Sequence, residues 1–217
     1  MKYKLTEETT IVYGRTLYRI EALKDFKDVK KGNKGGFIEN ENNLSQSGDC
    51  WVYGDGKVFD NAEVYGNAMV CDNAEVNDNA KVYGNAVVYG NAVVFGNAEV
   101  FDSAAIYDDA LVCDNVEVCN NARIYGYGEV YNNAVVRDNT KVYGKARIFD
   151  DVEIYGNAEV YDKAEVCENA EVYGNAKIYG NARVYCDTVV CDKAEVCGYS
   201  KIYGNAVICG NMKICRK

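Results

Sequence analysis

Apolar side chains recur at every sixth residue over most of the chain. Steps of six from Val52 to Ile214 give 28 positions, and every one of them is Val or Ile. The residue four positions after each of these is small, usually Ala, as at Ala62 and Ala68. Gly or Asp followed by Asn lies between them, so the common hexad reads V-Y-G-N-A-x. A fixed period of this kind is typical of a repeat architecture.

Each hexad predicts one short β-strand followed by one corner. The triplet x-V-Y places side chains alternately outward and inward, and Val, Ile, Tyr and Phe favour strands. Gly-Asn and Asp-Asn pairs turn the chain because Gly, Asn and Asp tolerate positive φ. If the chain coils, each strand pairs with the strand of the next turn. The complete lack of proline agrees with this arrangement, since nearly every backbone N–H would then join a ladder.

The hexad pattern resembles that of the hexapeptide-repeat proteins, whose motif is an aliphatic residue followed four positions later by a small one. This resemblance covers about residues 50–217. It implies an all-β fold, a left-handed parallel β-helix with three hexads per coil. The 28 hexads then make about nine coils.

Residues 1–48 break the period and predict a small N-terminal β cap. Within them, residues 10–12 and 17–20 are strand-like and flank Tyr13-Gly14-Arg15, which indicates a short hairpin. Such a cap would cover the strand edges and core of the first coil. We therefore divide the chain into a cap, residues 1–48, and a β-helix, residues 49–217.

The segment from Leu17 to Trp51 supports a closer resemblance. It contains L-Y-R-I-x-A-L-K-D-F, K-K-G-x-x-G-G-F-I-E and L-S-x-x-G-x-C-W. This segment is similar to the N-terminal part of YdcK-like proteins of bacteria and their phages. That family combines a cap with hexapeptide repeats and has no assigned biochemical role, so the resemblance supports the fold and implies no catalytic residues.

Three hexads per coil would place residues 18 apart on top of one another and sort the outward side chains onto three faces. We call these the first, second and third faces, after the residues that follow Val52, Val58 and Val64. The first face carries an unbroken row of tyrosines, here named the six-Tyr row. Its members are Tyr89, Tyr107, Tyr125, Tyr143, Tyr161 and Tyr179.

Two interpretations of the six-Tyr row are open. Aromatic neighbours stabilise a sheet by about 0.2–1 kcal/mol per pair, and a repeat multiplies such pairs without any role in binding. An aromatic stripe of this height is also larger than monomers usually leave bare, which favours an interface. The six tyrosines are therefore the candidate interface, and no catalytic, cofactor-binding or metal-binding residue is predicted.

Charge separates the faces further. The strand residues of the third face are mostly acidic, from Glu63 through Glu99 to Glu171, whereas basic and acidic residues largely alternate on the first face. Alternation is expected of a soluble ladder, and a regular acidic face could also imitate nucleic-acid phosphates. The net charge of −9 argues against direct binding to nucleic acid or to an anionic membrane.

The absence of a signal-peptide core and of any run of 18 apolar residues predicts a cytoplasmic chain. Its ten cysteines are then expected to be reduced. The stacked pairs Cys191/Cys209 and Cys197/Cys215 would be close enough to oxidise. Because these two pairs lie on different faces, their side chains diverge, which argues against a zinc site.

Many hexapeptide-repeat proteins are acyltransferases or carbonic anhydrases, and that resemblance implies catalytic or zinc-binding histidines. This chain has no histidine. The unbroken period also lacks the inserted loops that usually build a substrate pocket on such a fold. We therefore do not expect an enzyme.

The sequence predicts a non-catalytic, rod-like recognition or assembly scaffold without a cofactor. Its partner is expected to be a protein, and a dimer or trimer of the chain is expected because the period runs on to Ile214. If the chain is phage-encoded, it would bind and block a host protein. The alternative is an atypical acyl- or nucleotidyl-transferase that lacks the usual histidine.

Overall fold

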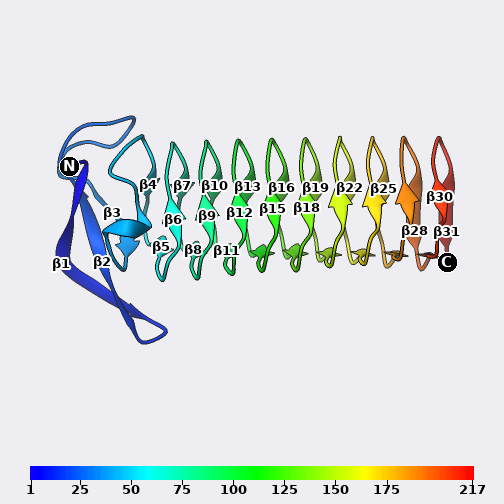
Figure 1. Ribbon diagram of the computed structural model, residues 1–217, viewed down its shortest axis with the longest axis horizontal. Coiled ribbons are helices and arrows are strands. Elements are labelled where there is room, and N and C mark those ends of the chain that lie inside the picture. Colours follow the sequence, from blue (N-terminus) through cyan, green and yellow to red (C-terminus); the bar gives the residue numbers. More distant parts are fainter.

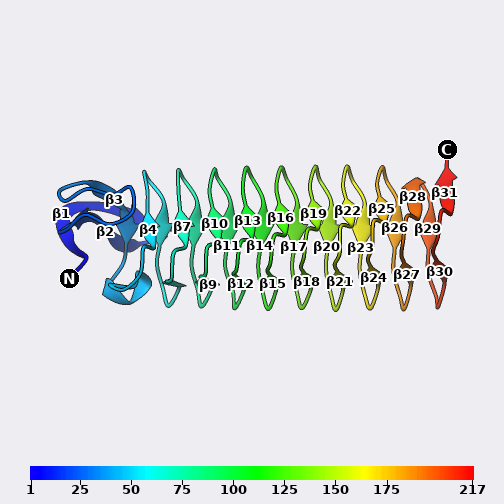
Figure 2. The ribbon, with the colours of Figure 1, turned by 90° about the horizontal axis from the view of Figure 1, so that it is seen from above.

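Stacked coils form a straight β-solenoid with a β-hairpin cap at the N-terminal end (Figure 1). The computed structural model describes residues 1–217. Strands 18 residues apart pair in parallel, as Val88 does with Ile106. The third-face strands run upward on the near side of Figure 1 while the chain advances from left to right, so the coil is left-handed (Figures 1 and 2). The predicted all-β solenoid is confirmed, with about ten coils, because the first face alone has ten strands.

The three predicted faces are the three parallel sheets of the solenoid. The first face comprises β4 (Trp51–Val52), β7 (Met69–Val70), β10 (Val87–Val88), β13 (Ala105–Ile106), β16 (Arg123–Ile124), β19 (Lys141–Val142), β22 (Glu159–Val160), β25 (Lys177–Ile178), β28 (Glu195–Gly198) and β31 (Lys213–Arg216). The second face comprises β5 (Lys57–Val58), β8 (Glu75–Val76), β11 (Val93–Val94), β14 (Leu111–Val112), β17 (Glu129–Val130), β20 (Arg147–Ile148), β23 (Glu165–Val166), β26 (Arg183–Val184) and β29 (Lys201–Ile202). The third face comprises β6 (Glu63–Val64), β9 (Lys81–Val82), β12 (Glu99–Val100), β15 (Glu117–Val118), β18 (Val135–Val136), β21 (Glu153–Ile154), β24 (Glu171–Val172), β27 (Val189–Val190) and β30 (Val207–Ile208).

The core is one column of aliphatic side chains along the solenoid axis. The repeated Val, Ile and Ala residues as far as Ile202 belong to a single cluster of 54 buried residues. Where Thr140, Thr188 and Ser200 replace Ala, the buried hydroxyl donates to the carbonyl oxygen three residues earlier, at 2.7–2.8 Å. Each buried hydroxyl is therefore satisfied.

The corners are stabilised by hydrogen bonds between equivalent positions of successive coils. Gly180 has φ of +75°, and its backbone N–H donates to Asp162 Oδ2 of the coil before it at 3.1 Å. Asp162 itself has φ of +61°. Asp therefore adopts the same left-handed corner as Gly and adds an acceptor for the next coil. The following Asn residues form amide ladders, as between Asn79 and Asn97 at 3.1 Å.

The cap joins the solenoid through a third strand. β1 (Tyr3–Val12) and β2 (Arg15–Ala22) form the predicted antiparallel hairpin, and β2 pairs antiparallel with β3 (Lys34–Ile38). β3 then pairs in parallel with β5, placing Ile38 beside Val58. Parallel stacking thus extends into residues 34–44, where the spacing to the next coil is 20 residues rather than 18.

Charged and polar groups hold the cap against the first coil. Lys2 is 1 % exposed, and its Nζ donates to the Cys50 carbonyl oxygen at 2.8 Å. Arg15 pairs with Glu39 and Asp60, and the second oxygen of Glu39 accepts from the Asp60 N–H at 2.7 Å. A single 3-10 turn, η1 (Glu41–Asn43), follows β3. The structure has no helix with the length and apolarity needed to cross a membrane.

Candidate functional site

The six-Tyr row stacks ring upon ring along the first face. Each tyrosine directly follows the buried Val or Ile of its strand, so its ring lies at the start of a corner and points outward. Adjacent ring centroids are 4.8–5.0 Å apart, and adjacent ring planes agree within 6°. All six side chains are half-buried. The predicted stacking is confirmed, and a role in binding stays a prediction.

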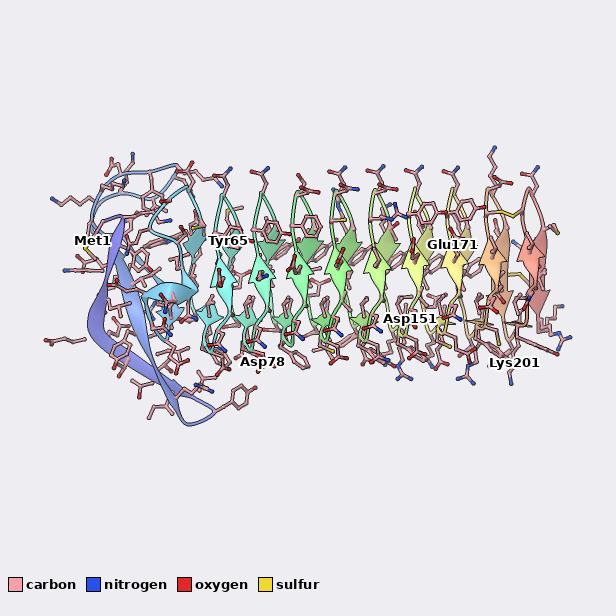
Figure 3. All side chains as sticks on the ribbon, viewed as in Figure 1. Met1, Tyr65, Asp78, Asp151, Glu171 and Lys201 are labelled. Carbon is pink, nitrogen blue, oxygen red and sulfur yellow. A yellow bond between two sulfur atoms is a disulfide. The ribbon has the colours of Figure 1, made fainter.

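Aromatic stacks on the other two faces are shorter. The third face has Tyr65, Tyr83 and Phe101 at 4.8 and 5.0 Å, and a separate pair further along. Figure 3 shows the outward side chains as rows along the rod, with Tyr65 near the cap and Glu171 farther along the same face. On the second face, Tyr131 stacks on Phe149 at 5.0 Å. The first face therefore carries the longest continuous aromatic surface.

Tyrosine hydroxyls in these ladders reach the strand residue that lies 16 positions ahead. In three of the four ladder positions where that residue is Glu, the hydroxyl donates to it. This contact joins Tyr83 to Glu99 at 3.0 Å, Tyr155 to Glu171, and Tyr179 to Glu195 at 3.0 Å. A carboxylate at this position thus completes the hydrogen bonding of the phenol.

Most of the six-Tyr row has no such acceptor. The hydroxyls of Tyr89, Tyr107, Tyr125 and Tyr161 face Ala105, Arg123, Lys141 and Lys177, and they have no hydrogen-bond partner within the protein. Tyr143 has Glu159 ahead of it, but the oxygens of Glu159 lie 3.3 Å from Lys141 Nζ and 3.8 Å from Lys177 Nζ. Five neighbouring hydroxyls are therefore free to bond outside the molecule.

Burial raises the pKa of the phenols in this row above the ordinary value. The direction holds for Tyr89, Tyr107, Tyr125, Tyr143 and Tyr161, and the charge of Glu159 adds to it at Tyr143. The hydroxyls are consequently protonated at neutral pH. They act there as hydrogen-bond donors.

The charged rows beside these ladders differ between the faces. On the first face, the residue that directly precedes the buried Val or Ile is basic in four strands and acidic in two from β10 to β31. On the third face, the strand residues include five acidic and one basic side chain. Arg123 on the first face and Glu117 on the third are exposed and form no ion pair. The two faces therefore carry opposite excess charge.

A loop of the cap covers the N-terminal end of the first face. Phe26 packs edge-on against Trp51 with ring centroids 5.3 Å apart. Asp28 accepts a hydrogen bond from the Tyr53 hydroxyl at 2.7 Å, and Lys27 Nζ lies 3.4 Å from the Met69 sulfur. The sequence pattern does not indicate this contact, because the loop shares no period with the face that it covers.

Four of the ten cysteines are joined in disulfides, so the expectation that all are reduced is wrong for these four. Cys191 bonds to Cys209 and Cys197 bonds to Cys215, with Cα atoms 4.6 and 4.5 Å apart. These are the pairs that stacking brings together, and Figure 3 shows them at the C-terminal end. Asp192 completes a group with Cys191 and Cys209 whose ligand atoms lie within 4.8 Å. Its carboxylate accepts from the Gly210 N–H at 3.0 Å.

The corner between the third and first faces holds a shallow polar hollow. Its lining consists of Asp102, Ser103, Asn120, Asn121, Asp138, Asn139, Gly156 and Asn157. Asp138 accepts from the Asn120 amide and from the Gly156 N–H, both at 2.9 Å. These carboxylates therefore take part in the corner ladders that connect successive coils.

Comparison with known proteins connects this solenoid to one family. The family described as YdcK Beta solenoid repeat matches residues 80–96 and 176–192. A protein of Escherichia coli (strain K12), named uncharacterized acetyltransferase YdcK, is 38% identical over 60 residues. The chain is therefore similar to YdcK β-solenoid proteins in these segments. The match covers 24% of this chain and 18% of that protein, so the chain spans less than a fifth of the relative's length in the match.

The two segments that match the YdcK repeat both contain a member of the six-Tyr row. Residues 80–96 include Tyr89, and residues 176–192 include Tyr179. The matched repeats therefore contribute to the first face, on which the free hydroxyls lie.

Proposed function

We propose that this YdcK-like chain is a non-catalytic recognition or assembly scaffold whose docking surface is the first face. The observation that carries the proposal is the row of five neighbouring tyrosine hydroxyls without a protein partner, from Tyr89 to Tyr161. Tyrosine is enriched at interfaces because it combines a rigid apolar ring with one polar group. A straight, stacked row of such rings offers a partner a preorganised surface, which lowers the entropy lost on binding.

The proposal is tested by comparing two aromatic pairs on different faces. The first-face variant is Tyr125→Ser with Tyr143→Ser, and the matched second-face control is Tyr131→Ser with Phe149→Ser. Both remove one stacked pair, with ring centroids 4.9 and 5.0 Å apart. The wild-type chain and both variants are immobilised and exposed to lysate from cells that carry the gene.

The first-face variant should capture about one tenth or less of the protein that the wild-type chain captures specifically. The control should capture the wild-type amount. Equal losses in the two variants would point to general destabilisation and contradict the assignment of the first face. The melting temperature of each variant checks that it is folded.

A finer form of the proposal concerns the source and the partner. If the chain is phage-encoded, binding to a host protein and blocking it would be a function of such a scaffold in the cytoplasm. An inhibition assay supports this form if the isolated host protein loses its activity when it is mixed with the wild-type chain. The host protein should keep its activity when it is mixed with the first-face variant.

An acetyl-transfer function is the second candidate, because the E. coli relative bears the name of an acetyltransferase. The chain has no histidine to act as general base, which favours the scaffold. Adding acetyl-CoA in a thermal-shift assay separates the two functions. A rise in melting temperature together with acetyl transfer to an amine would support the transferase.

A further inference from the structure

Four consecutive strand residues on the first face carry an excess of positive charge. They are Arg123, Lys141, Glu159 and Lys177, which read basic, basic, acidic, basic along the rod. Arg123 has no ion pair, and Lys141 and Lys177 share Glu159 as their acidic neighbour, at 3.3 and 3.8 Å. This stretch borders the free tyrosine hydroxyls, so it presents cations and hydrogen-bond donors side by side.

Four consecutive strand residues on the third face carry the complementary pattern. They are Glu99, Glu117, Val135 and Glu153, which read acidic, acidic, neutral, acidic. Glu117 is exposed and unpaired. Arg137, two residues after the neutral position, lies 3.0 Å from Glu153. The one neutral position of this row thus corresponds to the one acidic position of the first-face row.

We propose that the first face of one copy binds the third face of a second copy. This inference rests on the proposed function of the first face as a docking surface, and it names the partner. Arg123 would face Glu99, Lys141 would face Glu117 and Lys177 would face Glu153. The remaining acid, Glu159, would face Val135 with Arg137 beside it, so no like charges oppose each other over these four coils.

The spacing of the coils favours a second copy over an unrelated partner. Charges on the first face repeat once per coil, at the pitch that separates the stacked rings by 4.8–5.0 Å. The third face of any copy repeats at that pitch because the same coils form it. Two copies therefore stay in register over several coils.

The hydrogen bonds of tyrosine hydroxyls inside the molecule show which acceptors suit the free hydroxyls. Tyr53 donates to Asp28 of the cap loop, and Tyr83 donates to Glu99. A carboxylate from another segment thus already covers one position of the first face. Third-face glutamates of a second copy would extend the same contact along the six-Tyr row.

The contact joins two different surfaces, so it is heterologous. A copy that uses its first face still offers its third face to another copy. Assembly would accordingly close into a ring or continue as an open array, and it would weaken with salt because its charges are exposed.

Charge reversal on each face tests the proposal with the full chain. The first-face variant is Arg123→Glu with Lys141→Glu, and the third-face variant is Glu117→Lys with Glu153→Lys. Sedimentation at micromolar concentration should give wild-type masses above 24.0 kDa. Each variant alone should return 24.0 kDa. An equimolar mixture of the two variants should associate again, because the first-face variant keeps the acidic third face and the third-face variant keeps the basic first face.

A second-face reversal is the matched control. Arg183→Glu with Lys201→Glu changes two basic strand residues on that face and should leave the mass distribution at the wild-type value. Circular dichroism and melting temperature show whether every variant is folded. Raising sodium chloride from low to molar concentration should weaken wild-type association by about tenfold or more.

Three results would overturn the second-copy contact. They are a wild-type chain that stays at 24.0 kDa, a mixture of the two variants that stays monomeric, and a control that dissociates like the variants. If the wild type is monomeric and yet the six-Tyr row binds another protein in the capture experiment, this inference fails and the proposed function stands. If both experiments fail, the first face is not a docking surface.

Discussion

The rod and the cap of this protein are stabilised in different ways. In the rod, the same contacts recur from coil to coil between residues 16–18 positions apart, as in the Asp162 to Gly180 hydrogen bond. In the cap, each contact is used once, as in the burial of Lys2 against the Cys50 carbonyl. The stability of a repeat array is approximately a sum of repeat and neighbour terms. A local change in the rod should therefore weaken adjacent coils, whereas a change in the cap should loosen one end.

The largest expected effect breaks the core of the rod. Val142→Asp places a carboxylate in the apolar column where Val142 is fully buried. An uncompensated buried charge costs about 3–5 kcal/mol. Chemical denaturation should show a loss of this size and a transition that separates the coils on either side. Glu153→Lys, on an exposed strand position, should change the free energy of unfolding by less than about 1 kcal/mol. Equal midpoints for the two variants would contradict the inward assignment of Val142.

The next largest effect separates the strain of a corner from the stacking of coils. Gly144 has φ of +71°, and an added Cβ would lie 2.9 Å from the Asp162 nitrogen. Gly144→Ala should therefore cost about 2–4 kcal/mol, from left-handed strain plus overlap with the next coil.

Gly204 is the matched control for this corner. It has φ of +74°, but an added Cβ would meet nothing within 4 Å. Gly204→Ala should cost only the conformational term, about 1–2 kcal/mol. If both variants lose the same free energy in denaturant titration, stacking contributes nothing to the preference for glycine at Gly144.

A smaller effect tests whether the cap unfolds separately from the rod. Lys2→Met keeps the apolar part of the side chain and leaves the Cys50 carbonyl oxygen without its donor. An unsatisfied buried group of this kind costs about 1–3 kcal/mol. Hydrogen exchange should accelerate in residues 1–50 and stay at the wild-type rate in the middle coils. Lys4→Met, whose side chain is 50% exposed, should leave both regions unchanged. Faster exchange along the whole rod would mean that cap and rod unfold together.

The smallest effect concerns alkaline pH. Burial, followed by the contact with Glu171, raises the pKa of Tyr155 to about 12 from an ordinary value of 10.0. The folded state then holds its proton where the unfolded state has lost it, so stability is complete below pH 10 and falls as the pH rises from 10 to 12. Unfolding titrations across this range should show the decline, and Tyr155→Phe should make it shallower. An unchanged slope in that variant would exclude Tyr155 as a contributor.

The sequence alone determined which side chains of the rod point inward, because the period of six fixes them, and the resemblance to hexapeptide-repeat proteins added the three hexads per coil. Val52 and its equivalents point inward, the six-Tyr row stacks, and Cys191 meets Cys209, all because a repeat places each residue on its own equivalent. Only the tertiary structure decided how the cap is arranged. Lys2 reaches Cys50, Arg15 reaches Asp60 and the loop at Asp28 covers Tyr53 across separations that follow no period. The choice of ion pairs, and hence which tyrosine hydroxyls stay free, likewise depends on side-chain reach between neighbouring coils, which residue spacing alone does not specify.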